Sequence, residues 1–76
     1  MTELELMQDI GGNIDSILKE NNMTQQDLVR ETGINKSTIS KYINGIMMPS
    51  VKNLVNIAHV LACDVSEFVF SDEFIE

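Results

Sequence analysis

The sequence predicts an all-α fold of five short helices around one core. Apolar residues make up 43% of the 76 positions, and they recur at spacings of three and four residues. There is one proline and no tryptophan, so a β-rich module is not expected. A chain of this length forms one small domain, whose core is sufficient if the helices keep the loops short.

The first predicted helix extends from about residue 5 to about residue 21. It carries apolar side chains at helical spacing, namely Leu4, Met7, Ile10, Ile14, Ile17 and Leu18. Residues 1–8 are expected to form an N-terminal extension that continues into this helix. Gly11 and Gly12 lie inside it, and each is expected to weaken it by about 1 kcal/mol relative to alanine.

Residues 24–45 predict two short helices joined by a tight turn. Thr24 and Asp27 have the spacing of a capping box, in which each side chain satisfies a free backbone N–H group. Gly33 suits the left-handed backbone of a sharp turn. Asn35 is a favourable N-cap for the second helix, so this helix is expected to begin immediately after it.

The second of these two helices has two different faces. At about 100° per residue, Ile39, Tyr42 and Ile43 share one arc. The opposite arc carries two cations, two hydroxyls and an amide, with no acid among them: Lys36, Ser37, Ser40, Lys41 and Asn44. Such a face can donate to base edges and phosphates in a major groove. Taken alone, it is more typical of an ordinary solvated helix than of a DNA-binding one.

The order of residues along the chain resembles the Cro/repressor-type (XRE, phage-repressor-like) helix-turn-helix family. The matching positions follow one another without gaps and are Thr24-Gln25, Leu28, Thr32-Gly33-Ile34, Ser37-Thr38-Ile39-Ser40, Asn44-Gly45, Pro49-Ser50, Leu54, Ile57-Ala58 and Leu61. The resemblance covers residues 9–70 and implies a lambda-repressor-like DNA-binding fold, in which the second and third helices form the helix-turn-helix. Residues 71–76 are expected to be an acidic tail beyond it.

The resemblance also implies site residues. Those expected to contact DNA bases are Lys36, Ser37, Ser40 and Lys41. Those expected to contact phosphates are Thr24, Gln25, Asn35, Thr38 and Asn44. Because lysine can donate to guanine O6 and N7, a half-site that contains guanine is expected.

The apolar loop 46–48 has two open interpretations, since its residues either enter the core or contact another molecule. The family often dimerises through its C-terminal region. Candidate contacts with a second copy or another protein are Met47, Met48, Phe70, Phe74 and Ile75. The alternative for the last three is that they cap the core.

The last two helices are predicted from residue 50 onward. Ser50 is the expected N-cap of the fourth, whose buried stripe is expected to be Val51, Leu54, Ile57, Ala58 and Leu61. Ala62 occupies a position where relatives usually have glycine, so a strained helix end is expected. Asp64 and Glu67 have capping-box spacing for a short fifth helix.

Several functional classes are not expected. Cys63 and His59 are the only residues of their kinds, which argues against a disulfide, a metal site and a histidine-based catalytic site. We therefore expect no enzyme activity and no cofactor. There is no apolar run of about 18 residues and no signal segment, so a cytoplasmic protein is expected.

The net charge of −7 is unusual for a DNA-binding protein. Residues 1–23 hold five acids against one lysine, and so do residues 46–76, whereas residues 24–45 hold two acids against three cations. Only the central segment is not acidic. The leading hypothesis is a sequence-specific transcriptional regulator, a repressor that binds its operator as a homodimer. The alternative is a protein-interaction module on the same fold, antitoxin-like or anti-repressor-like.

Overall fold

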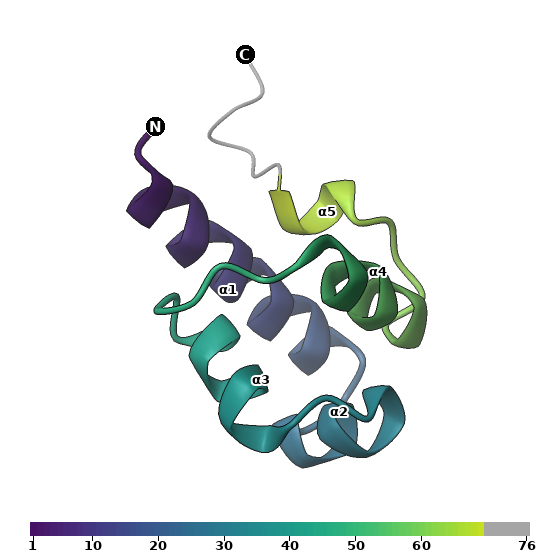
Figure 1. Ribbon diagram of the computed structural model, residues 1–76. Helices are drawn as coiled ribbons and strands as arrows, with labels where there is room; N and C mark the ends of the chain where they lie inside the picture. Colours follow the sequence, from purple (N-terminus) through teal and green to yellow (C-terminus); the bar gives the residue numbers. More distant parts are fainter. Residues whose placement is uncertain (70–76) are drawn as a thin grey trace.

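The computed structural model describes residues 1–69 and confirms the all-α prediction, with no strand in that range (Figure 1). The five helices are α1 (Glu3–Glu20), α2 (Gln25–Thr32), α3 (Lys36–Ile43), α4 (Val51–Val60) and α5 (Ser66–Val69). Phe70, Phe74, Ile75 and the predicted tail lie outside the described residues. Within residues 1–69, every helix is too short or too polar to span a bilayer.

The longest helix, α1, is the element against which α3 and α5 pack (Figure 1). It begins two residues earlier than predicted because Thr2 caps it. The Glu5 backbone N–H donates to Thr2 Oγ1 at 3.1 Å, and the Thr2 N–H donates to Glu5 Oε1 at 3.2 Å. This reciprocal pair satisfies two donors at the helix start, and it extends α1 into residues 1–8.

The core draws on all five helices. Its buried apolar residues are Ile10, Ile14, Leu18, Leu28, Ile39, Tyr42, Leu54, Ile57, Ala58, Leu61 and Phe68. Helix α2 in turn packs against α3 and against α4. The two helices of the predicted helix-turn-helix therefore pack against each other, with α1 behind α3 and α4 behind α2.

The predicted stripe of α4 is wrong at one position. Leu54, Ile57, Ala58 and Leu61 are buried, but Val51 is 77% exposed. Val51 is the first residue of α4, directly after the Ser50 N-cap. Helical spacing places it in line with the stripe, but no other described element covers the Val51 side chain. The position of a residue on one face of a helix does not show whether another element extends far enough along that helix to cover it.

The glycine pair of α1 has a role that the sequence analysis missed. Gly11 is buried, and a Cβ atom there would collide with the main-chain oxygen of Tyr42 and lie 2.7 Å from that of Ile43. A Cβ atom on Gly12 would meet nothing within 4 Å. Gly11 therefore lets the backbones of α1 and α3 approach closely, whereas Gly12 lies in open space.

Left-handed backbone occurs where turns were predicted. Gly33 has φ of 75°, as expected for the turn between α2 and α3. Ala62 has φ of 55°, so the predicted strain after α4 is confirmed. A non-glycine residue in this region costs about 1–2 kcal/mol, which the surrounding packing must offset.

Gly11→Ala and Gly12→Ala should have opposite effects on the free energy of unfolding. Gly11→Ala should lower it by about 1–3 kcal/mol, because the methyl group forces the backbones of α1 and α3 apart. Gly12→Ala should raise it by up to about 1 kcal/mol through helix propensity alone. Urea unfolding followed by circular dichroism measures both. Equal effects of the two substitutions would contradict the close approach.

Candidate nucleic-acid interface

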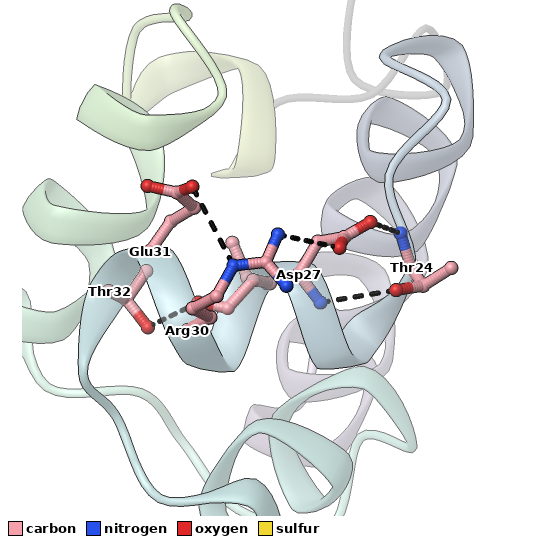
Figure 2. Close-up of polar contacts among 6 residues, drawn as sticks. Thr24, Asp27, Arg30, Glu31 and Thr32 are labelled. Atoms are coloured by element: carbon pink, nitrogen blue, oxygen red, sulfur yellow. Dashed lines mark hydrogen bonds and ion pairs between the residues drawn. The ribbon is translucent and has the colours of Figure 1, made fainter.

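We call α2, α3 and the turn between them the turn unit. The predicted capping box closes the start of its first helix, α2 (Figure 2). The Asp27 N–H donates to Thr24 Oγ1 at 3.1 Å, and the Thr24 N–H donates to Asp27 Oδ2 at 2.9 Å. The bond from the Thr24 backbone, followed by those from the Arg30 and Thr24 side chains, lowers the pKa of Asp27. Gln25 is exposed beside this cap, where helix N–H groups face solvent and suit an anion.

The turn between α2 and α3 is organised around Thr32. Its hydroxyl donates to the Leu28 carbonyl at 2.7 Å (Figure 2). The same hydroxyl accepts from the Ile34 N–H at 3.1 Å. The next residue, Gly33, ends α2 by donating its N–H to the Val29 carbonyl at 2.9 Å. Ile34 then packs against the core. These contacts fix the exit of the chain from α2, and thus the start of α3.

The second helix, α3, has the two faces that the sequence predicts. Ile39 and Tyr42 are buried, at 1% and 3% exposed. Three of the predicted base-contacting side chains, Lys36, Ser37 and Lys41, are exposed, and the fourth, Ser40, is partly exposed. The predicted base-contacting residues thus share the outer face of one helix.

Asparagines close both ends of α3. Asn35 Oδ1 accepts from the Ser37 N–H at 2.7 Å and so caps the start. Asn44 Nδ2 donates to the Ser40 carbonyl at 2.8 Å and lies 3.3 Å from Ser40 Oγ. The Asn35 amide keeps Nδ2 as a donor that a phosphate could accept from, whereas Asn44 Nδ2 is already engaged by the two Ser40 oxygens. Thr38, the remaining predicted phosphate contact on α3, is partly buried.

The charges of the turn unit are divided unevenly between its helices. On α2, Arg30 Nη2 lies 2.9 Å from Asp27 Oδ1, and Arg30 Nε lies 4.0 Å from Glu31 Oε1 (Figure 2). Among the described residues, no carboxylate pairs with Lys36 or Lys41. The positive charge of this unit therefore lies on the outer face of α3, while α2 carries a net negative charge.

The apolar loop after α3 has both fates that the sequence left open. Met48 packs against the core, whereas Ile46 is 68% exposed and Met47 is 37% exposed. On α4, Val55 is 53% exposed one turn beyond the exposed Val51. We call Ile46, Met47, Val51 and Val55 the apolar surface group. The two valines were not predicted to be exposed, since sequence periodicity does not reveal which neighbours are missing.

The single cysteine and the single histidine lie away from the outer face of α3. Cys63 is half-buried against the core, and burial, with smaller effects of Glu67 and Asp64, raises the pKa of its thiol. His59 is exposed on α4. Within residues 1–69, no three histidine, cysteine or acidic side chains gather as metal ligands.

The comparisons with known proteins agree with this geometry. The model of the helix-turn-helix family HTH_3 matches residues 14–68, which is most of the chain. The chain belongs to the HTH_3 family. The predicted resemblance is thereby confirmed, and the HTH_3 family and fold are those of DNA-binding regulators, which are not enzymes. None of the curated proteins compared with the chain matches it in sequence.

Three solved structures share the fold. The hypothetical transcription factor NHTF from Neisseria has a TM-score of 0.85 and 15% identity, over 96% of this chain and 84% of that protein. The clp gene regulator ClgR from Corynebacterium glutamicum has a TM-score of 0.79 and 19% identity, over 83% and 67%. The restriction-modification controller protein C.AhdI from Aeromonas hydrophila has a TM-score of 0.78 and 18% identity, over 82% and 94%.

Two residues that the sequence analysis did not single out connect α4 to the helix-turn-helix. Asn53 Nδ2 on α4 donates to Tyr42 Oη on α3 at 2.8 Å. Asn56 Nδ2 on α4 donates to the Thr32 carbonyl on α2 at 2.9 Å. Both asparagines are half-buried. The only signal in the sequence is a pair of amides three residues apart, next to the apolar stripe of α4.

Thermal stability should fall as the pH drops below the ordinary Asp27 pKa of 3.8. Hydrogen bonds in the folded state favour the carboxylate, so the folded pKa lies below the unfolded one. Its contribution is therefore present above the unfolded pKa and is lost as pH falls through the folded pKa. Asp27→Asn keeps an acceptor oxygen but does not titrate, so its Tm should fall less between about pH 5 and pH 2.5.

A matched variant for this experiment is Glu31→Gln, because Glu31 meets Arg30 only at 4.0 Å and caps no helix. Its Tm should follow the wild-type pH dependence. The pKa of Glu5 is lowered mainly by the hydrogen bond from the Thr2 backbone. Glu5 is present in all three proteins, so its effect on Tm at low pH is common to them. Parallel curves for wild type and Asp27→Asn would contradict a role for the Asp27 cap.

Proposed function

We propose that this protein is a transcriptional repressor that binds an operator as a homodimer, with α3 in the major groove. The observation that carries the proposal is the outer face of α3, where Lys36 and Lys41 are exposed without an acid. B-DNA admits an α-helix in its major groove, and lysine donates to guanine O6 and N7 there. Lys36, Ser37, Ser40 and Lys41 are the proposed base contacts.

The proposed phosphate contacts surround this face. Thr24 and Gln25 lie at the start of α2, Asn35 and Thr38 at the start of α3, and Asn44 at its end. Such contacts set the register of the protein on the duplex without reading its sequence. All five side chains are uncharged, so these contacts release few counterions on binding. With a net charge of −7, non-specific affinity for DNA should be weak.

The repressor role is consistent with the small size of the described domain. Binding at a promoter is sufficient to block access to that DNA, and this requires no catalytic site. Two proteins of similar structure are named as a clp gene regulator and a restriction-modification controller protein. Their names support control of transcription as the function of this chain as well.

The experiment that tests DNA recognition is selection of duplexes from a random pool at low salt. We expect a palindromic sequence with guanine in each half-site, and half-sites about 34 Å apart. The logarithm of affinity should fall with the logarithm of salt concentration at about 0.9 per phosphate neutralised, so a shallow slope is expected. If no sequence in the pool were enriched, the proposed sequence-specific DNA binding would be wrong.

Single substitutions then locate the contacts on the selected operator. Lys36→Ala and Lys41→Ala should each lower operator affinity by about tenfold, since a good base contact provides about 1–3 kcal/mol. Lys19→Ala removes the same charge from α1, where Lys19 pairs with Asp15 at 2.8 Å, and should change affinity little. Fluorescence anisotropy measures the operator affinity of each variant. Equal losses of affinity from all three would mean that the lysines of α3 act only through their charge and not through base contacts.

The proposed dimer uses the apolar surface group, which follows α3 directly in the chain. Val51→Glu should weaken self-association by more than tenfold, because a carboxylate would be buried between the two copies. Ser16→Glu, at an exposed position of α1, adds the same charge elsewhere. Sedimentation velocity over a range of concentrations measures both. Unchanged association of Val51→Glu would exclude this surface from the interface.

A protein-interaction module remains the second candidate function. The observations in its favour are the charge of −7 and the exposed side chains of Ile46 and Met47. It predicts that no duplex is enriched, while a protein partner is lost with Met47→Ser. The same selection experiment therefore separates the two candidates.

A further inference from the structure

Helix α4 contacts both helices of the turn unit through one amide each. Asn53 donates to the Tyr42 hydroxyl of α3 at 2.8 Å, and Asn56 donates to the Thr32 carbonyl of α2 at 2.9 Å. The two asparagines are three residues apart, so they project from the same side of α4. Helix α4 thus forms one hydrogen bond with each helix of the turn unit, and the relative direction of those two helices determines how α3 meets DNA.

The point on α2 is the end of the helix. The last carbonyl groups of a helix have no hydrogen-bond partner within that helix. Asn56 Nδ2 supplies a donor to one of them, the Thr32 carbonyl. The Thr32 hydroxyl is already bonded to the Leu28 carbonyl and the Ile34 N–H. Thr32 is therefore held at both its carbonyl and its side chain, immediately before the left-handed Gly33. The bond from Asn56 fixes the turn that starts α3.

The point on α3 determines the rotation of that helix about its own axis. Tyr42 is 3% exposed, and its main-chain oxygen lies against Gly11 of α1. The bond from Asn53 fixes the far end of the same side chain. With Tyr42 held at its backbone and its hydroxyl, the direction of the opposite face, which carries Lys36 and Lys41, is fixed as well.

We propose that Asn53 and Asn56 are positioning residues, which fix the direction and rotation of α3 relative to α2 for sequence-specific DNA binding. This rests on the proposed function. Apolar burial of Leu54, Ile57, Ala58 and Leu61 already attaches α4 to the core. Hydrophobic burial is non-directional, whereas hydrogen bonds require defined distances and angles. The amides therefore contribute geometry more than attachment.

The two bonds differ in a way that allows a matched test. A tyrosine hydroxyl both donates and accepts, whereas a carbonyl only accepts. Asn53→Asp can therefore keep its bond, with Tyr42 now the donor. Asn56→Asp cannot, because a carboxylate would face the Thr32 carbonyl. Each substitution adds one negative charge to α4 and changes the side-chain size little, so general electrostatic effects on DNA binding are similar.

The measurement is the ratio of affinity for the selected operator to affinity for a random duplex, by fluorescence anisotropy. Asn53→Asp should keep this ratio within about threefold of wild type. Asn56→Asp should lower it more than tenfold while its affinity for the random duplex matches that of Asn53→Asp. Tyr42→Phe and Asn53→Leu, which each remove the Tyr42 bond, should lower the ratio as well. Urea unfolding reports whether each variant is folded.

The outcomes separate the two proposals. Equal ratios for wild type, Asn56→Asp and Asn53→Leu would overturn the positioning role and leave DNA recognition intact. If Asn56→Asp does not fold, Asn56→Ala replaces it, and an unchanged ratio for that variant counts against the role. If wild-type protein enriches no duplex, the proposed function fails and the positioning role fails with it.

Discussion

The close approach of α1 and α3 at Gly11 is the constraint on which the rest of the structure depends. Because no side chain fits between Gly11 and the Tyr42 and Ile43 carbonyls, the two helices meet backbone to backbone. This contact directs Tyr42 and Ile39 into the core. It also directs the opposite face of α3 away from the protein. A helix packed so closely on one side is well placed to offer its other side to a partner.

Polar contacts then refine what apolar packing begins. The capping boxes at Thr2 and Thr24 set where α1 and α2 begin, and Thr32 sets where α2 ends. These bonds are local, within about one helical turn. The bonds from Asn53 and Asn56 are of another kind, since they join helices that are distant in sequence. Local bonds determine the length of each helix, and long-range bonds determine how the helices are directed.

The charge distribution explains how an acidic protein can present a basic face. Arg30 and Lys19 are each paired with an acid on their own helix. The exposed cations of α3 have no such partner among the described residues. Sequence counting assigns the turn unit a charge of +1, but ion pairing places the usable positive charge on α3 alone. An isolated pair of lysines gives a face with few phosphate contacts, so its direction relative to DNA matters more.

The sequence by itself determined the five helices, the caps at Thr24, Asn35 and Ser50 and the two faces of α3, because these depend on residues within a few positions of one another. It also indicated the strained Ala62 and the ordered helix-turn-helix pattern. Only the tertiary structure decided that Gly11 is a contact point rather than a weakness, that Val51 is exposed, and that Asn53 and Asn56 brace the turn unit. Each of these depends on which distant element lies opposite a residue. Periodicity along one helix carries no information about that neighbour.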